Sequence, residues 1–153
     1  MVVKVRHTGI VVADMEKALS FYRDLLGIDK VLVDAEVKND FLERISSLPG
    51  VTLRAVMLEA PDGNRVELLQ YLSHPRTPPA QVACCDIGCS HLAFQVEDVE
   101  ALYAKLLEAG VEANAPPQVD PQGYAKVTFV HDFDGTLIEL VQILDETKTI
   151  YRD

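Results

Sequence analysis

Two short stretches of the sequence resemble each other and share one chemical feature. Residues 62–70 read DGNRVELLQ, and residues 134–142 read DGTLIELVQ. In each, an Asp-Gly turn signal precedes a strand-like apolar run that contains one glutamate, Glu67 or Glu139. An ionised carboxylate in an apolar strand is costly unless a cation or a metal ion compensates it. The repetition therefore marks both glutamates as candidates for chemistry.

A histidine opens an apolar strand pattern earlier in each half of the chain. His7 stands in VVKVRHTGIVV, and His91 stands in SHLAFQV. Because side chains alternate faces along a strand, the small residues Gly9 and Ala93 share the faces of these histidines and would leave room beside them. Two imidazoles and two carboxylates suit Zn²⁺, Ni²⁺, Co²⁺, Fe²⁺ or Mn²⁺. The four residues predict one divalent-metal site.

Each of these residues has a simpler interpretation when it is taken alone. Glu67 could form an ion pair with Arg65, which lies on the same strand face. A single histidine in a strand is more often a hydrogen-bonded core residue than a ligand. Taken as a repeated His–Glu pair, however, the four residues favour the metal interpretation.

The predicted elements also repeat, in the order strand, helix, strand, strand, strand. The first half is predicted to contain a strand over 2–12, a helix capped by Asp14 and ended by Gly27, and strands over 28–33, 51–59 and 65–72. The second half is predicted to contain a strand over 90–96, a helix from Asp98 to Gly110, and strands over 111–115, 125–132 and 136–144. A polar, partly helical insertion at about 39–50 lengthens the first half. The repetition predicts an α+β fold in which two tandem βαβββ modules form a curled mixed β-sheet cup.

The domain boundaries follow from composition. The 153 residues are expected to form a single domain, with module 1 at about 1–75, a Pro-rich linker at about 76–86, module 2 at about 87–145 and a tail at 146–153.

Charge and cysteine content restrict the partners and the compartment. The formal net charge of −10 argues against nucleic acids and anionic membranes as partners. Cys84, Cys85 and Cys89 are crowded into one segment, which is a poor disulfide framework and favours linker thiols over a soft zinc site. No apolar run reaches the roughly 18 residues of a membrane span. We expect a cytoplasmic protein.

The same residues carry a resemblance to a known family. HTGIVVADMEKALSFYRDLLGI, SHLAFQVEDVEALYAKLLEAGV and FDGTLIELVQ resemble the vicinal oxygen chelate superfamily, also called the glyoxalase/bleomycin-resistance/dioxygenase family. The resemblance covers about residues 5–144. It implies one divalent metal ion per cup, which chelates a small-molecule substrate through vicinal oxygens. His7, Glu67, His91 and Glu139 match the ligand positions. Members often form dimers, and a homodimer in which each chain builds its own cup is expected.

The branch of the family stays open. The chain is similar to glyoxalase I in having a glutamate at the second ligand position, but it has Val11 where that enzyme commonly has an arginine. Methylmalonyl-CoA epimerases have a catalytic glutamate on a strand after the first helix, where this chain has Arg54 in VTLRAVML. Extradiol dioxygenases have no ligand at the position of Glu67.

The resemblance implies a proton transfer next to a metal-chelated carbonyl, through an enediolate. Glu139, or Glu67, is expected to act as the base of a metal-dependent isomerase, lyase or epimerase. The alternatives are an extradiol-type ring-cleaving dioxygenase and a non-catalytic drug-binding resistance protein. Four further residues are candidates for substrate binding: Arg54, Arg65, Tyr71 and Tyr124.

Overall fold

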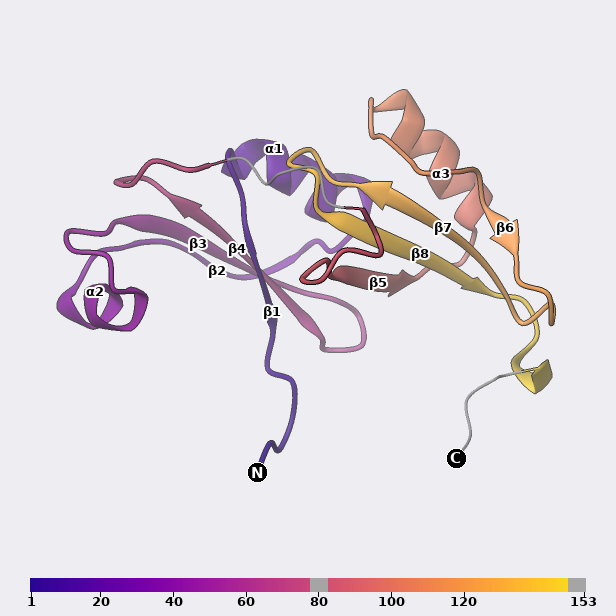
Figure 1. Cartoon of the computed structure of the whole chain (residues 1–153), viewed down its shortest axis with the longest axis horizontal. Coiled ribbons are helices and arrows are strands. Elements are labelled where there is room, and N and C mark those ends of the chain that lie inside the picture. The colour runs from indigo at the N-terminus through magenta and orange to yellow at the C-terminus, as the bar shows by residue number, and fades with distance from the viewer. Residues whose placement is uncertain (78–82, 149–153) are drawn as a thin grey trace. The chain divides into compact units, whose positions relative to one another are not determined.

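A computed structural model describes residues 1–77 and 83–148, and it contains two compact units (Figure 1). The contacts divide the chain into Met1–Pro78 and Pro79–Asp153. Each unit has its own four-stranded mixed sheet, and the order strand, helix, strand, strand, strand occurs in both, as predicted. The predicted linker overlaps residues 78–82, and the predicted tail overlaps residues 149–153. Residues 78–82 and 149–153 lie outside the described residues.

Unit 1 has the sheet order β1-β4-β3-β2. β1 is parallel to β4, whereas β3 is antiparallel to both β4 and β2. The elements are β1 (Thr8–Val11), α1 (Met15–Leu19), a π-helical turn η1 (Ser20–Leu25), β2 (Lys30–Val37), α2 (Asp40–Ser46), β3 (Leu53–Glu59) and β4 (Arg65–Tyr71).

Unit 2 repeats this arrangement with the order β5-β8-β7-β6. β5 is parallel to β8, and β7 is antiparallel to both β8 and β6. The elements are β5 (His91–Gln95), α3 (Val99–Glu108), β6 (Gln118–Val119), β7 (Ala125–His131), β8 (Leu137–Ile143) and a 3₁₀ turn η2 (Glu146–Lys148).

The predicted helix signals are confirmed. Asp14 accepts a hydrogen bond from the Lys17 backbone N–H at 3.0 Å, and Asp98 accepts one from the Ala101 N–H at 3.0 Å. These are N-cap bonds, which satisfy N–H groups that have no partner inside the helix. After the helices, Gly27 has φ +79° and Gly110 has φ +82°, a backbone conformation that glycine adopts without steric cost.

Three predicted strands differ from the structure. The strand predicted over 28–33 is β2, which starts at Lys30 and extends to Val37 alongside β3. The strand predicted over 2–12 is limited to β1, because β4 starts at Arg65 and Thr8 already pairs with Val66, so earlier residues have no strand beside them. The strand predicted over 111–115 is reduced to one bridge, between Ala113 and Val130. Two prolines at 116–117 lack N–H donors and interrupt the pairing, which resumes in β6.

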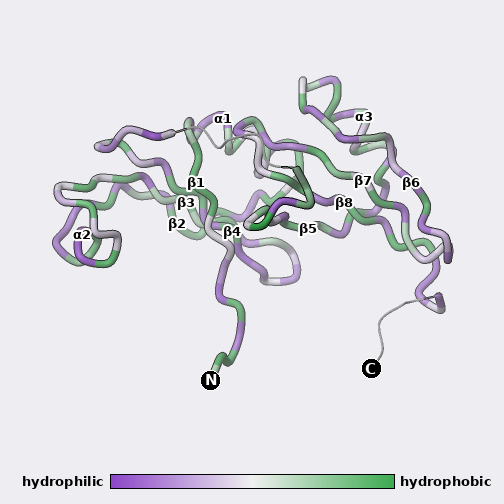
Figure 2. The backbone as a smooth tube through the Cα atoms, viewed as in Figure 1, coloured by the Kyte–Doolittle hydropathy of each residue, from purple (hydrophilic) through white to green (hydrophobic). Residues whose placement is uncertain are grey.

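The two faces of each sheet differ in burial. In unit 1, α1 contacts β4, and the side chains directed to that face include Val56, Leu58, Val66 and Leu68, which are at most 4% exposed. In unit 2, α3 contacts β7 and β8, where Val130, Ile138 and Leu140 are fully buried. The hydropathy along the strands changes between hydrophobic and hydrophilic accordingly (Figure 2). The alternate residues, which include both glutamates, lie on the face away from the helix.

Arg54 connects the helix face of the unit 1 sheet to α1. Its guanidinium donates to Asp34 on β2 at 2.8 Å and to Glu16 on α1 at 2.6 Å. The hydrogen bonds to Asp34, and then that to Glu16, raise the pKa of Arg54 above its ordinary value. The same contact lowers the pKa of Asp34. These bonds compensate the charge of Arg54 on the face that otherwise carries the buried apolar side chains Val56 and Leu58.

No helix among the described residues has the length and apolar character needed to cross a membrane.

The core of unit 1 gives a stability prediction. Leu68 is 0% exposed, whereas Leu72, just beyond the same strand, is 46% exposed. Leu68→Ala is expected to lower the free energy of unfolding by about 2–5 kcal/mol, since it removes buried methyl groups and leaves a cavity. Leu72→Ala is the control, with an expected change of less than about 1 kcal/mol. Urea unfolding followed by circular dichroism measures both, and equal effects would contradict the assigned burial.

Candidate metal centre

The parallel strand pair of each unit brings a histidine and a glutamate together. In unit 1, Gly9 on β1 pairs with Glu67 on β4. His7 comes two residues before Gly9 and so has the same side-chain direction. In unit 2, Ala93 on β5 pairs with Glu139 on β8, and His91 is two residues before Ala93. The register is the same in both units, although the sequences around it differ.

The side-chain atoms that meet are also the same. His7 Nε2 lies 3.3 Å from Glu67 Oε2, and His91 Nε2 lies 3.0 Å from Glu139 Oε2. The side chains of His7 and Glu67 are 35% and 24% exposed, and those of His91 and Glu139 are 45% and 22% exposed. All four side chains are therefore partly accessible to solvent. A glycine or alanine opposite each glutamate leaves the space next to the carboxylate unfilled; a Cβ added at Gly9 would meet only Leu69 Cδ1, at 3.9 Å.

The simpler interpretation of Glu67 does not match the geometry. Arg65 donates through Nε and Nη2 to Oε2 of Glu59, both at 2.9 Å, and not to Glu67. Lys30 Nζ binds the other oxygen of Glu59 at 2.6 Å. Within residues 1–77 and 83–148, neither Glu67 nor Glu139 forms an ion pair with a lysine or arginine. Each carboxylate has a histidine as its neighbour and no fixed cation.

The donor chemistry fits a divalent ion. Imidazole nitrogen and carboxylate oxygen are ligands of Zn²⁺ and of the neighbouring first-row ions. In the described part of either unit, however, no third histidine, cysteine, aspartate or glutamate joins a pair to make a group of three. Each unit therefore carries one histidine–glutamate pair.

The two pairs differ in what surrounds the histidine. The His91 ring packs edge to face on Phe129, with 5.3 Å between ring centroids and an interplanar angle of 84°. Phe129 is the strand partner of Glu139. In unit 1 the partner of Glu67 is Met57. Sequence reasoning missed Phe129, although its place opposite the second glutamate could be found from the hairpin register.

The other predicted site residues lie farther away. Arg54 lies on the face toward α1, where Asp34 and Glu16 bind it, so the structure does not bring it to Glu67. Tyr71 shares the face of Glu67 but lies four residues along β4, which is about 13 Å. Tyr124 precedes β7, five residues from the partner of Glu139, which is about 16 Å along the strand.

The cysteines and the remaining histidines do not extend the pairs. Cys84 and Cys85 are exposed free thiols, and Cys89 is a half-buried free thiol. His131 contacts the Asn114 side chain at 2.8 Å, and His74 contacts the Ser73 hydroxyl at 2.8 Å.

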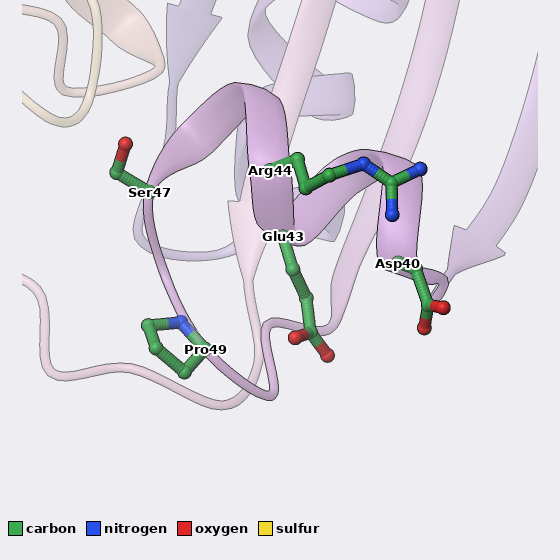
Figure 3. A pocket seen from close by; sticks show the side chains of 5 residues that line it. All are labelled: Asp40, Glu43, Arg44, Ser47 and Pro49. Atoms are coloured by element: carbon green, nitrogen blue, oxygen red, sulfur yellow. The ribbon is translucent and has the colours of Figure 1, made fainter.

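A surface hollow of about 400 Å³ lies in the segment that lengthens unit 1 (Figure 3). None of its lining residues belongs to a His–Glu pair. They are Asp40, Glu43, Arg44, Ser47 and Pro49.

Comparison with known proteins identifies the family. The profile of the Glyoxalase/Bleomycin resistance protein/Dioxygenase superfamily matches residues 4–140. The chain belongs to this superfamily. An ethylmalonyl-CoA/methylmalonyl-CoA epimerase of Cereibacter sphaeroides is 29% identical over 147 residues, which cover 94% of this chain and 100% of that protein. The predicted family membership and fold are thereby confirmed.

Solved structures agree. The trypanothione-dependent glyoxalase I of Leishmania major is 29% identical, with a TM-score of 0.64 over 91% of this chain and 86% of that one. A glyoxalase family protein of Bacillus cereus has a TM-score of 0.84 over 95% of this chain and 97% of that one, at 23% identity, which shows a shared fold. The superfamily includes metal-dependent isomerases, lyases and dioxygenases of small molecules.

The Glu59 ion pairs give a pH prediction. Hydrogen bonds from Lys30, and then from Arg65, lower the pKa of the Glu59 carboxyl. A carboxylate with a lowered folded-state pKa stabilises the fold above its ordinary pKa, and this contribution is lost as the pH falls through the folded-state value. Glu59→Gln should therefore be slightly less stable than wild type at about pH 7, and the difference should shrink as the pH falls below the ordinary glutamate pKa of about 4.3. Urea unfolding at several pH values measures it; a difference independent of pH would contradict the assignment.

Proposed function

We propose that this protein is a divalent-metal-dependent isomerase or epimerase that moves a proton on the carbon next to a carbonyl group. His7, Glu67, His91 and Glu139 would together hold one divalent ion, namely Zn²⁺, Ni²⁺, Co²⁺, Fe²⁺ or Mn²⁺. The observation that carries the proposal is the repeated pair, in which the same imidazole and carboxylate atoms meet at 3.3 Å and 3.0 Å in two units of different sequence. The relatives named as epimerase and glyoxalase I support this class of reaction.

The bound ion and the two glutamates would have different roles in the proton transfer. The ion, when bound, supplies a Lewis acid that polarises a carbonyl and its neighbouring oxygen. Glu139 is the preferred base: its carboxylate is 22% exposed and pairs with no lysine or arginine among the described residues, and it would have to loosen from the ion to accept a proton from the adjacent carbon and return it. Glu67, its counterpart in unit 1, is the second candidate and would serve the opposite face of that carbon.

Substrate contacts would come from the same sheet faces. Arg65 and Tyr71 share the strand face of Glu67 and are the better candidates. Tyr124 lies farther from its glutamate, and Arg54 is excluded from this set because its guanidinium binds Asp34 and Glu16. We further propose that the protein is cytoplasmic and forms a homodimer with one metal site per chain. Light scattering would measure the mass of the assembly, and metal analysis would measure the number of ions per chain.

A ring-cleaving dioxygenase is the second candidate, because the family includes this class. Glu67 counts against it, since such enzymes use three ligands. A non-catalytic binding protein would not need four ligand side chains.

The metal set predicts a large effect of one histidine. His91→Ala should weaken Zn²⁺ binding by at least about 100-fold, because it removes one of four ligands. His74→Ala, which alters a histidine outside the pairs, is the control and should bind Zn²⁺ as wild type does. Competition with a chromophoric chelator gives the affinities. Wild-type protein that holds no ion, or equal affinities for the two variants, would overturn the proposal.

The base assignment predicts a loss of proton exchange. The metal-loaded protein should exchange the α-proton of a 2-oxo or 2-methyl thioester substrate in D₂O, as NMR would detect. Glu139→Gln should slow this exchange by about 100-fold or more. Oxygen uptake with a catechol, with no α-proton exchange and no sensitivity to Glu67→Gln, would instead establish the dioxygenase.

A further inference from the structure

A row of three charged side chains crosses the unit 1 sheet beside Glu67. Lys30 on β2 pairs with Glu59 on β3, and Glu59 pairs with Arg65 on β4. Glu67 is two residues beyond Arg65 on the same strand face, which is about 7 Å. The row is therefore next to the proposed chelation site.

In this row the carboxylate is more buried than the two cations, which solvent can reach. The Glu59 side chain is 14% exposed, whereas Arg65 is 33% exposed and Lys30 is 63% exposed. Glu59 uses one oxygen for each cation. Among the described residues neither cation has a second acidic partner, so one carboxylate holds two positive charges and the row keeps a net charge of +1. The guanidinium uses only Nε and Nη2, which leaves Nη1 available to an incoming anion.

The fold does not require this row. Unit 2 builds the same sheet with Leu137 in place of Arg65 and His131 in place of Glu59. Leu137 is 7% exposed, so this position accepts a packed apolar side chain. Half-exposed ion pairs also contribute little to stability. A charge arrangement that one unit has, and that its structural repeat lacks, points to recognition.

We propose that Lys30 and Arg65, held in place by Glu59, bind a single carboxylate of the substrate, which limits the substrate class to monocarboxylic acids and their derivatives. The inference rests on the proposed metal site, because that site would hold the chelating oxygens. A net charge of +1 suits a monoanion, and Arg65 offers a guanidinium fork that matches carboxylate geometry. Apart from the histidines, the strand neighbours of the two glutamates are apolar and include Met57, Leu69, Phe129 and Val141, so the part of the substrate beside them is expected to be uncharged.

Two chelating ligands of equal shape test the recognition. The monohydroxamate of succinic acid carries a free carboxylate, and 4-methylpentanohydroxamate replaces that carboxylate with an isopropyl group. Zn²⁺-loaded wild-type protein should bind the first about tenfold more tightly by isothermal titration calorimetry. Arg65→Leu, which copies the unit 2 residue, should abolish this preference. Lys30→Met should reduce the preference by about threefold.

Glu59→Gln gives a result of the opposite sign. It removes the internal carboxylate that competes for the two cations, so the preference for the carboxylate ligand should increase by about threefold or more. Lys126→Met is the charge-matched control, since Lys126 binds Glu100 on the helix face of unit 2, and it should retain the wild-type preference. A preference that Arg65→Leu retains, or that Glu59→Gln lowers, would overturn the proposal.

A metal-free measurement separates this inference from the metal site. In metal-free protein at physiological salt, propionate should shift the NMR signal of the Arg65 Nε–H group, and Lys126→Met should not change this shift. If neither hydroxamate binds the Zn²⁺-loaded protein, the proposed function fails, and the propionate titration alone decides whether the row binds a carboxylate. Absence of the propionate shift, or a shift combined with equal affinities for the two hydroxamates, would refute recognition of the substrate by the row.

Discussion

The parallel pairing of the first and last strands of each unit is the constraint on which the candidate site depends. It places Gly9 opposite Glu67 and Ala93 opposite Glu139. Because side-chain direction repeats every two residues, a histidine two positions earlier extends over the same face as the glutamate. A shift of one residue in either register would direct the glutamate to the face of the sheet that the helix covers, away from its histidine.

The helices matter because they cover only one side. α1 and α3 pack against the apolar faces of their sheets, which supply most of the buried side chains. The other faces stay open, so polar groups can reach solvent there without the cost of full burial. Arg54 belongs to the covered side, where Asp34 and Glu16 compensate its charge. The sheets thus separate residues that hold the fold from residues that can meet a ligand.

The two units share their backbone plan and differ in the side chains around the glutamate. Unit 2 places an aromatic ring against its histidine and surrounds Glu139 with apolar groups. Unit 1 has Met57 at the position of Phe129, and a charged row beside Glu67. A duplicated scaffold with two equal halves would treat the two ends of a substrate alike. Under the proposed function, the difference between the halves would allow a polar end and an apolar end of a substrate to be distinguished.

The sequence by itself determined the repeated element order, the helix caps and the four candidate ligands. These follow from local rules: Asp14 and Asp98 satisfy free N–H groups, Gly27 and Gly110 adopt positive φ, and an isolated glutamate in an apolar strand is costly. Sequence reasoning overextended the strand before Thr8 and misplaced the one near Val111, because the length of a strand depends on where its partner begins. Only the tertiary structure decided that Arg65 binds Glu59, that Arg54 faces α1 and that Phe129 contacts His91. Those contacts join residues on different strands and helices, and the register that aligns them is a property of the assembled sheet.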